Sequence, residues 1–229
     1  MTVLVYDMNM KYLSMMLKGI FAGASIALGG FLFILVTSIN SSEIFKVLGA
    51  LIFPFGLFLV CFFKFNLFTG KIGLIFEKRQ EKDFYISLPL MYLGNLIGSL
   101  IIGYLCYFIF RNTDIFNRVT AINEAKTTLD SFDAYVVMIV KSLITGLCVY
   151  LAVKSYNVCN KMYQKIILVF IFIAIFVYIG GDHCVANMFY FSFGNNWGLN
   201  SIINILIVTI CNSLGTIPGV LLFKNLLLK

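Results

Sequence analysis

The stretch IGGDHCVANMFYF, residues 179–191, holds the only histidine of the chain, His183, directly after Asp182. It follows a strongly apolar run, and its Gly-Gly-Asp sequence interrupts that run before a second apolar segment begins. A histidine titrates near neutral pH, so an imidazole in such a place can take part in proton transfer as well as in packing. The interruption and its histidine therefore decide how the surrounding apolar sequence is interpreted.

The composition is typical of a membrane protein. Of the 229 residues, 61% are hydrophobic and only 12% are charged, whereas about 25% of the residues of soluble domains are charged. Runs of about 18 or more uncharged residues are candidate transmembrane helices. The sequence therefore predicts an all-α polytopic membrane protein with six spans, near residues 19–40, 46–69, 84–110, 134–154, 166–191 and 200–223.

The basic residues predict the orientation of these spans. One side of the membrane would hold eleven of them: Lys11, Lys18, Lys71, Lys78, Arg79, Lys82, Lys154, Lys161, Lys165, Lys224 and Lys229. The other side would hold four: Lys46, Arg111, Arg118 and Lys126. Because cytoplasmic loops are rich in Lys and Arg, we expect both termini, residues 1–18 and 224–229, to be cytoplasmic segments of a protein of the plasma (inner) membrane. Nucleic-acid binding is the weaker interpretation of the net charge, since no basic and aromatic patch accompanies it.

An internal repeat divides the transmembrane domain, residues 19–223. GNLIGSL (94–100) matches CNSLGTI (211–217), 117 residues later, and the same offset lays FKFNLFTGK (63–71) on GGDHCVANM (180–188). Each half, 19–110 and 134–223, has three spans, so the second half is expected to be inverted relative to the first. Paired interruptions in inverted repeats are typical of a transport site near the middle of the membrane; the alternative is a pair of ordinary kinked helices.

Several polar side chains lie at predicted membrane depth. Ionisable groups there are costly and often line a transport path, which favours such a role for His183 over a purely structural one. Asn187, four residues later, shares its helix face and could donate a hydrogen bond to a solute or to a neighbouring helix. Asp182 could orient the imidazole or simply end the apolar helix. Lys64 and Lys141 could reach an interface with their ammonium groups or attract anions to a vestibule.

Other kinds of site find little support. The six cysteines contain no Cys-x-x-Cys pair, and with a single histidine a metal site is not expected. No Ser–His–Asp set, carboxylate pair or phosphate-binding loop is present, so we expect neither an enzyme nor a cofactor.

The motifs resemble those of the formate/nitrite transporter family. GGDHCVANMF (180–189) is similar to the Gly-x-Glu-His-x-x-Ala-Asn-Met motif of the family's fifth span, and NLFTG (66–70) to the Leu-Phe-Thr of the loop that interrupts its second span. LGNLIGSL (93–100) and the Asn204, Asn212 and Gly215 pattern of the last span resemble two further signatures. The resemblance extends from about residue 19 to residue 223.

The resemblance implies a homopentamer with an aquaporin-like fold and one pore per protomer, which carries small monovalent anions such as formate, nitrite, hydrosulfide or lactate. It implies one apolar constriction at Phe53 and Phe176 and another at Leu57 and Phe68. The polar positions of the path would be Thr69, His183, Asn187 and Asn212. In such a pore an anion is drawn to a positive vestibule, is protonated near the constrictions, and passes as the neutral acid. A neutral acid avoids most of the desolvation cost of an ion.

The sequence also departs from the family pattern. Asn66 replaces a glutamate before Leu-Phe-Thr, Lys64 replaces a small residue, and Asp182 replaces the motif glutamate. Gly146 stands where an asparagine is usual, and a family lysine aligns only loosely with Lys126. These changes make the path more cationic and leave the preferred anion open.

A neutral-solute channel of the water or ammonia kind is the alternative, although paired Asn-Pro-Ala motifs are absent. A third interpretation is an intramembrane enzyme that uses His183 and Asp182. Such an enzyme would need a further catalytic group, and the sequence offers only lysines at membrane depth.

Overall fold

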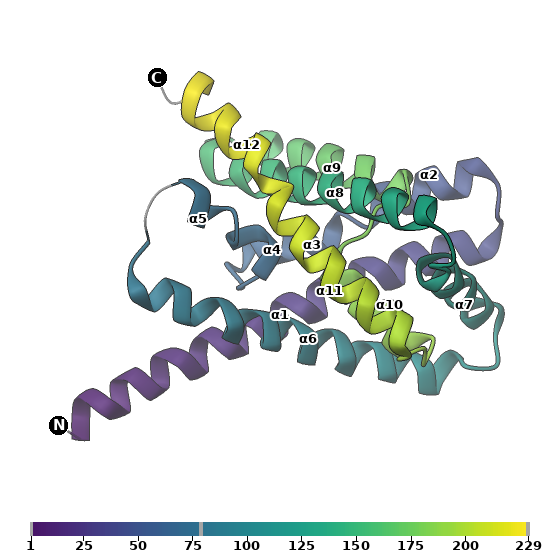
Figure 1. The fold of residues 1–229 in the computed structure, drawn as a ribbon, viewed down its shortest axis with the longest axis horizontal. Coiled ribbons are helices and arrows are strands. Elements are labelled where there is room, and N and C mark those ends of the chain that lie inside the picture. Colours follow the sequence, from purple (N-terminus) through teal and green to yellow (C-terminus); the bar gives the residue numbers. More distant parts are fainter. Residues whose placement is uncertain (1, 78–79, 228–229) are drawn as a thin grey trace.

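The computed structural model describes residues 2–77 and 80–227, and all regular structure in these two ranges is helical (Figure 1). Lys78, Arg79 and Lys229, which contributed to the predicted orientation, lie outside the described residues. The helices are α1 (Thr2–Ile39), α2 (Glu43–Ile52), α3 (Phe55–Phe62), α4 (Phe68–Lys71), α5 (Leu74–Glu77), α6 (Lys82–Phe110), α7 (Asp114–Thr127), α8 (Phe132–Val158), α9 (Met162–Tyr178), α10 (Cys184–Phe193), α11 (Leu199–Leu214) and α12 (Thr216–Leu222), followed by a π-helical turn at Phe223–Leu227.

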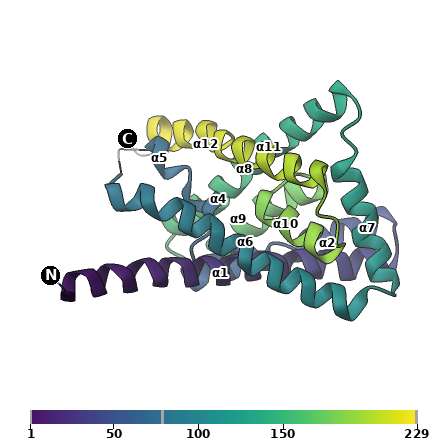
Figure 2. The same ribbon diagram turned by 60° about the horizontal axis from the view of Figure 1, so that its bottom comes forward.

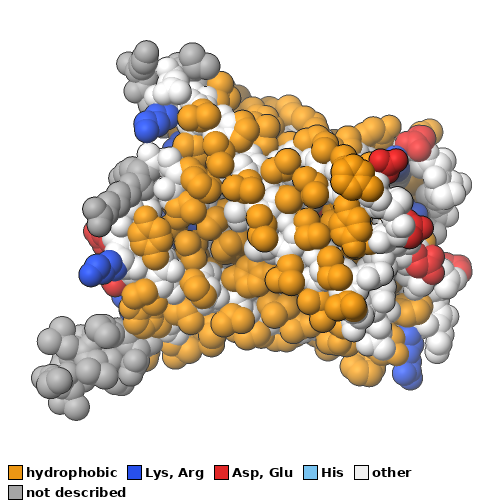
Figure 3. Space-filling view, viewed as in Figure 1, with side chains coloured by type: hydrophobic (Ala, Val, Ile, Leu, Met, Phe, Trp, Pro, Cys, Tyr) orange, Lys and Arg blue, Asp and Glu red, His pale blue; other side chains and the backbone are white. Residues whose placement is uncertain are grey.

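Long apolar helices dominate the fold. In the described part of the chain five stretches are long and apolar enough to cross a membrane: Met10–Ile39, Glu43–Phe62, Lys82–Phe110, Phe132–Val158 and Leu199–Asn225. The shorter apolar helices α9 and α10 follow one another between the last two. Figure 3 shows a broad band of hydrophobic side chains on one face, with the charged side chains gathered at its two ends. This is the surface of a multi-pass membrane protein, whose middle lies in hydrocarbon and whose ends lie in water.

Two stretches of non-helical backbone lie inside the bundle. The first separates the end of α3 at Phe62 from the start of α4 at Phe68, and the second separates the end of α9 at Tyr178 from the start of α10 at Cys184. Both contain a residue with left-handed backbone, Lys64 with φ 55° and Gly180 with φ 68°. Lys64 and Gly180 are 116 residues apart, and the N–H of each donates to the carbonyl three residues earlier, at 3.3 and 3.0 Å.

An asparagine holds the first of these stretches in place. Asn95 of α6 accepts the backbone N–H of Phe68 at 2.8 Å. Its amide donates to the carbonyls of Gly19 and Asn66, both at 2.9 Å. One side chain thus supplies hydrogen-bond partners to a backbone N–H of α4 and to backbone carbonyls of the preceding loop and of α1. Inside a membrane protein such backbone groups cannot be left unpaired without a large energetic cost.

Asn212 of α11 does the same for the second stretch. It accepts the backbone N–H of Cys184 at 3.0 Å and donates to the carbonyls of Ser142 and Asp182, both at 2.9 Å. Asn66 and Asp182 therefore occupy equivalent places, as do Phe68 and Cys184. The repeat offset is 117 between the two asparagines but 116 within the breaks, so the predicted alignment of 63–71 on 180–188 is wrong by one residue.

Close helix crossings accompany the two asparagines. A Cβ atom on Gly23 of α1 would lie 2.1 Å from the carbonyl oxygen of Asn95, and a Cβ atom on Gly146 of α8 would lie 2.1 Å from that of Asn212. Only glycine allows backbones to approach so closely, as in other membrane helix contacts. An asparagine could not replace Gly146 in this structure, because its side chain would collide with the backbone of α11.

Two elements differ from the sequence-based expectation. The first helix begins at Thr2 rather than near residue 19 and runs as one rod to Ile39. Helix α7 was not foreseen, because Asp114–Thr127 contains Asp, Asn, Arg, Glu and Lys and has no apolar run. It packs against α1, α10 and α11, at the end of the molecule opposite both termini (Figures 1 and 2).

Candidate functional site

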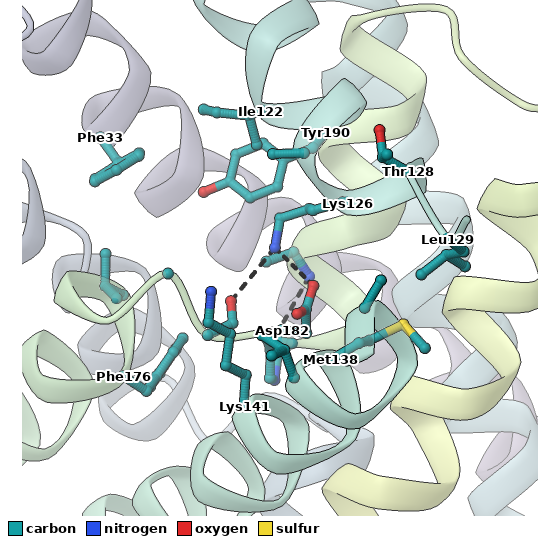
Figure 4. A pocket seen from close by; sticks show the side chains of 18 of the residues that line it. Phe33, Ile122, Lys126, Thr128, Leu129, Met138, Lys141, Phe176, Asp182 and Tyr190 are labelled. Atoms are coloured by element: carbon teal, nitrogen blue, oxygen red, sulfur yellow. Dashed lines mark hydrogen bonds and ion pairs between the residues drawn. The ribbon is translucent and has the colours of Figure 1, made fainter. Parts of the chain in front are cut away.

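A cavity of about 500 Å³ lies at the end of the molecule that carries α7. Its charged lining residues are Lys46, Arg118, Lys126, Lys141, Asp133 and Asp182. Figure 4 shows how α7, α8 and the stretch before α10 surround it, with Lys126 and Lys141 on either side of Asp182. Four cationic side chains against two carboxylates give this cavity, here called the α7 vestibule, a positive balance.

An aromatic pair forms part of the wall of the α7 vestibule. Phe53, after α2, and Phe176 of α9 both line the cavity and meet edge to face, with 5.9 Å between ring centroids. They are only 2% and 3% exposed. The ring of Phe176 also lies 6.2 Å from the imidazole of His183. His183 lines the same cavity, so the vestibule presents two apolar rings and the imidazole side by side.

His183 lies at the N-terminus of α10 and is 2% exposed. Its Nε2 atom is 2.7 Å from the hydroxyl of Thr69 in α4. Its Nδ1 atom accepts the backbone N–H of Ala186 at 3.3 Å and so caps the helix. The two non-helical stretches, far apart in sequence, therefore meet at one hydrogen bond between His183 and Thr69.

These bonds define the protonation of the imidazole. A backbone N–H can only donate, so Nδ1 must be an unprotonated acceptor; the hydrogen of the neutral ring is then on Nε2 and is donated to the Thr69 oxygen. A proton on Nδ1 would face the N–H of Ala186 and would add positive charge at a helix N-terminus, where the helix dipole disfavours it. The geometry fits a neutral His183 whose partner, Thr69, has a hydroxyl hydrogen left to donate.

Asp182 forms a buried polar network beside the histidine. Its carboxylate accepts the ammonium of Lys126 and the amide of Asn187, at 2.7 and 2.9 Å. Asn187 also donates to Asn204 at 2.9 Å. The Lys126 and Asp182 side chains are only 12% and 7% exposed, so this is a buried ion pair. The carboxylate of Asp182 accepts from α7 and α10 and not from the imidazole, contrary to the idea that it orients His183.

A smaller cavity of about 160 Å³ lies at the other end of α8. Lys64, Lys71, Gly70 and Leu67 line it, together with Val153 and Asn157 of α8. Lys141, in the α7 vestibule, and Val153 are twelve residues apart on one helix, which corresponds to about 18 Å along its axis. Helix α4, which carries Gly70 and Lys71, lies nearer the chain termini than α7 does (Figure 1). The second cavity is therefore called the termini-side pocket below.

The remaining expected site residues fall into two groups. Leu57 and Phe68 are 1% and 9% exposed and line neither cavity, so they lie in the packed region around the Thr69–His183 bond. Asn212 uses both ends of its amide on backbone, as described above, and is fully buried. It shapes the path by fixing α10, not by a side-chain group left free for a solute.

Two features of the site were not foreseen from sequence. One is the contact of Lys126 with Asp182, since the sequence indicated only a loose match of Lys126 to a family lysine and a search for apolar runs overlooks the polar helix that carries it. The other is Lys71, whose ammonium donates to the Asn66 side-chain oxygen at 2.7 Å. Lys141 was foreseen, and its Nζ lies 3.6 Å from where a Cβ on Gly180 would stand.

The chain resembles known transport proteins over nearly its whole length. The profile of the family described as "Formate/nitrite transporter" matches residues 2–225. The formate channel FocA of Haemophilus influenzae is 26% identical over 205 residues, which cover 82% of this chain and 69% of that protein. A probable formate transporter of Methanothermobacter thermautotrophicus is 27% identical over 229 residues, which cover 85% and 81% of the two chains.

Solved structures share the fold. A pentameric formate channel with formate bound superposes with a TM-score of 0.81 at 21% identity, covering 96% of this chain and 99% of that one. An ion channel of the FNT family superposes with a TM-score of 0.77 at 24% identity, covering 91% and 87%. The likeness to these two structures shows the fold. Because the family match extends over residues 2–225, the chain belongs to the formate/nitrite transporter family and is a channel or transporter, not an enzyme.

Proposed function

We propose that the protein conducts small monovalent anions of weak acids, such as formate, nitrite or hydrosulfide, across the plasma (inner) membrane. The observation that carries the proposal is the bond between His183, which lines the cationic α7 vestibule, and the buried Thr69, with a second cation-lined cavity toward the other end of α8. A cationic cavity raises the local concentration of anions, whereas the apolar region favours a neutral species. This order of environments suits an anion that is collected as an ion and crosses as its acid.

We infer the following path from the α7 vestibule. The ammonium of Lys141 and the guanidinium of Arg118 attract the anion, while the charge of Lys126 is balanced by Asp182. At Phe53 and Phe176 the anion loses water, and its charged form becomes costly there. It takes a proton from vestibule water, and the acid that results accepts a hydrogen bond from the Thr69 hydroxyl. In this account His183 stays neutral and holds the Thr69 hydroxyl in place.

The termini-side pocket continues the same path. Leu57 and Phe68 form the second apolar closure, after which the acid reaches Lys64 and loses its proton to water. The two halves of the chain, each with three spans and an interrupted middle span, would form an inverted repeat of the aquaporin-like kind. With the Lys and Arg bias of the sequence, both termini are proposed to be cytoplasmic.

The competing proposal is a channel for neutral water or ammonia. It finds support in the packed apolar region but leaves the cations of both cavities without a role. Purified protein in proteoliposomes separates the two: formate, nitrite and hydrosulfide uptake is measured beside the water and ammonia permeability of the same vesicles. We expect uptake of at least one anion well above that of empty liposomes. Water or ammonia permeability with no anion uptake would contradict the proposal.

A further inference from the structure

We infer that Lys71 and Lys64 form an anion-binding site in the termini-side pocket, with no carboxylate to neutralise it. The inference rests on the proposed transport function and adds a specific site to it. It starts from a comparison between the two breaks. At each break a lysine ammonium donates, at 2.7 Å, to the side-chain oxygen of a residue in an equivalent position: Lys126 to Asp182, and Lys71 to Asn66.

The equivalence of Asn66 and Asp182 rests on backbone contacts. The carbonyl of Asn66 accepts from the amide of Asn95, and the carbonyl of Asp182 accepts from the amide of Asn212, at 2.9 Å in both cases. The difference between the breaks is the side chain at this one place. The carboxylate of Asp182 balances the charge of its lysine, whereas the neutral amide of Asn66 orients Lys71 and leaves its positive charge uncompensated.

Two hydrogen bonds to α1 fix the orientation of Asn66. Its side-chain amide donates to the carbonyl of Met15 in α1 at 3.2 Å, and its backbone N–H donates to the carbonyl of Lys18 at 3.1 Å. With its amide hydrogens directed at α1, its oxygen faces Lys71. The ammonium of Lys71 is therefore fixed at the edge of the pocket and still has hydrogens to donate to a bound anion.

Lys64 supplies the second cation. It lies at the position whose counterpart in the other break is Gly180, and both residues have left-handed backbone, with φ 55° and 68°. Residues other than glycine rarely adopt this conformation, because their Cβ atom crowds the backbone. Lys64 has this conformation nonetheless, and it is one of the residues that line the same pocket. No Asp or Glu is among the described residues that line it.

The environment of Lys71 also calls for a counter-ion. Burial lowers the pKa of the Lys71 ammonium from its ordinary value, and the positive charge of Lys18 lowers it further. Glu77, on the nearby helix α5, is engaged by the Lys154 ammonium and the Tyr150 hydroxyl, at 2.8 and 2.9 Å. A small monovalent anion between Lys71 and Lys64 would supply the negative charge that the described protein groups do not.

The test measures formate uptake from each side of the membrane. Oriented vesicles, with a tagged C-terminus whose protease access reports the orientation, give the half-saturating concentration on the termini side and on the α7 side. We expect Lys71→Met and Asn66→Asp, which copies the Lys–Asp pair of the other break, to raise the termini-side value at least about fivefold, the scale of one lost charge in a partly buried site. Neither variant should change the α7-side value by as much as about twofold.

Two further variants complete the test: a control that keeps the charge of Lys71, and one that removes the charge of Lys64. Lys71→Arg keeps the charge and should stay within about twofold of the unmodified protein on both sides. Lys64→Gly removes the second ammonium but suits the left-handed backbone, so the protein should fold normally while the termini-side value rises. Unchanged termini-side values in Lys71→Met and Asn66→Asp, or an equal rise on both sides, would overturn the site.

A binding measurement separates the site from the transport function. Line broadening of ¹³C-formate is recorded with each purified protein in detergent, after its melting temperature has been compared with that of the unmodified protein. If the unmodified vesicles take up no anion, the transport proposal fails. The site nevertheless stands if broadening is present in the unmodified protein and lost in Lys71→Met and Asn66→Asp. Equal broadening in all three proteins, or none in any, rejects the site.

Discussion

The buried pair of Lys126 and Asp182 predicts a stability effect at the scale of single residues. Lys126→Met would leave the Asp182 carboxylate without its cation in a site that is 7% exposed, and breaking one partner of a buried pair costs about 3–5 kcal/mol. Removing both charges, in Lys126→Met with Asp182→Asn, should restore much of this loss. The free energy of unfolding in detergent measures both effects.

The control is Lys11→Met, which breaks the pair between Lys11 and Asp83. Both of these side chains are about half exposed, at 47% and 48%, and exposed pairs contribute about 0–1 kcal/mol. Similar losses in Lys11→Met and Lys126→Met would mean that the Lys126 pair is not buried in the folded protein.

At this scale the sequence indicated which residues lie close together better than it indicated their hydrogen-bond partners. His183 and Thr69 were both expected along the path, and they are bonded to each other. Asn187 was expected to share a face with His183, yet its amide serves Asp182 and Asn204. Spacing along one helix shows which side chains point the same way. It does not show which partner another helix supplies, so the contacts of Lys126 with Asp182 and of Lys71 with Asn66 were not foreseen.

At the scale of helices, the crossing of α8 and α11 depends on Gly146. A Cβ atom there would lie 2.1 Å from the backbone oxygen of Asn212, so Gly146→Ala must separate the two helices and disturb the amide that holds α10. Overpacking of this kind costs about 1–3 kcal/mol or more, and we expect a lower melting temperature and a lower yield of folded protein.

Gly198 provides the comparison, since a Cβ atom on it would meet nothing within 4 Å. Gly198→Ala should leave the melting temperature nearly unchanged, because only the backbone preference differs. Equal destabilisation by the two substitutions would argue that glycine acts through chain flexibility rather than through the close crossing.

The apolar runs predicted the long helices well and the elements between them poorly. Hydropathy locates α6 and α8 within a few residues, because hydrocarbon requires long uncharged helices. It carries no information on the polar helix α7, nor on how far α1 extends beyond its apolar part toward Thr2. The one-residue error in the repeat arises because the asparagines and the breaks they hold are not separated by the same number of residues in the two halves.

At the scale of the whole molecule, a large apolar surface is left uncovered. Ile101, Leu105 and Phe108 of α6 and Val137 and Val140 of α8 are 48–66% exposed. Lipid covers such a surface, and so do further copies of the chain. We predict that the protein purified in mild detergent is a homopentamer, which native mass spectrometry would record as five copies. A monomer at the lowest detergent concentration that keeps the protein folded would contradict this.

The measurement that tests the central claim most directly is formate uptake into proteoliposomes as a function of external pH, for the unmodified protein and for His183→Asn. Asparagine is a good N-cap residue, so the variant keeps the start of α10 but loses the imidazole that holds Thr69. We predict that uptake by the unmodified protein accelerates as the external pH falls, and that the variant is slower at every pH but keeps this acceleration, because the proton comes from water. Uptake independent of pH in the unmodified protein, or a variant that loses only the acceleration, would contradict the account; the latter result would make His183 the proton donor.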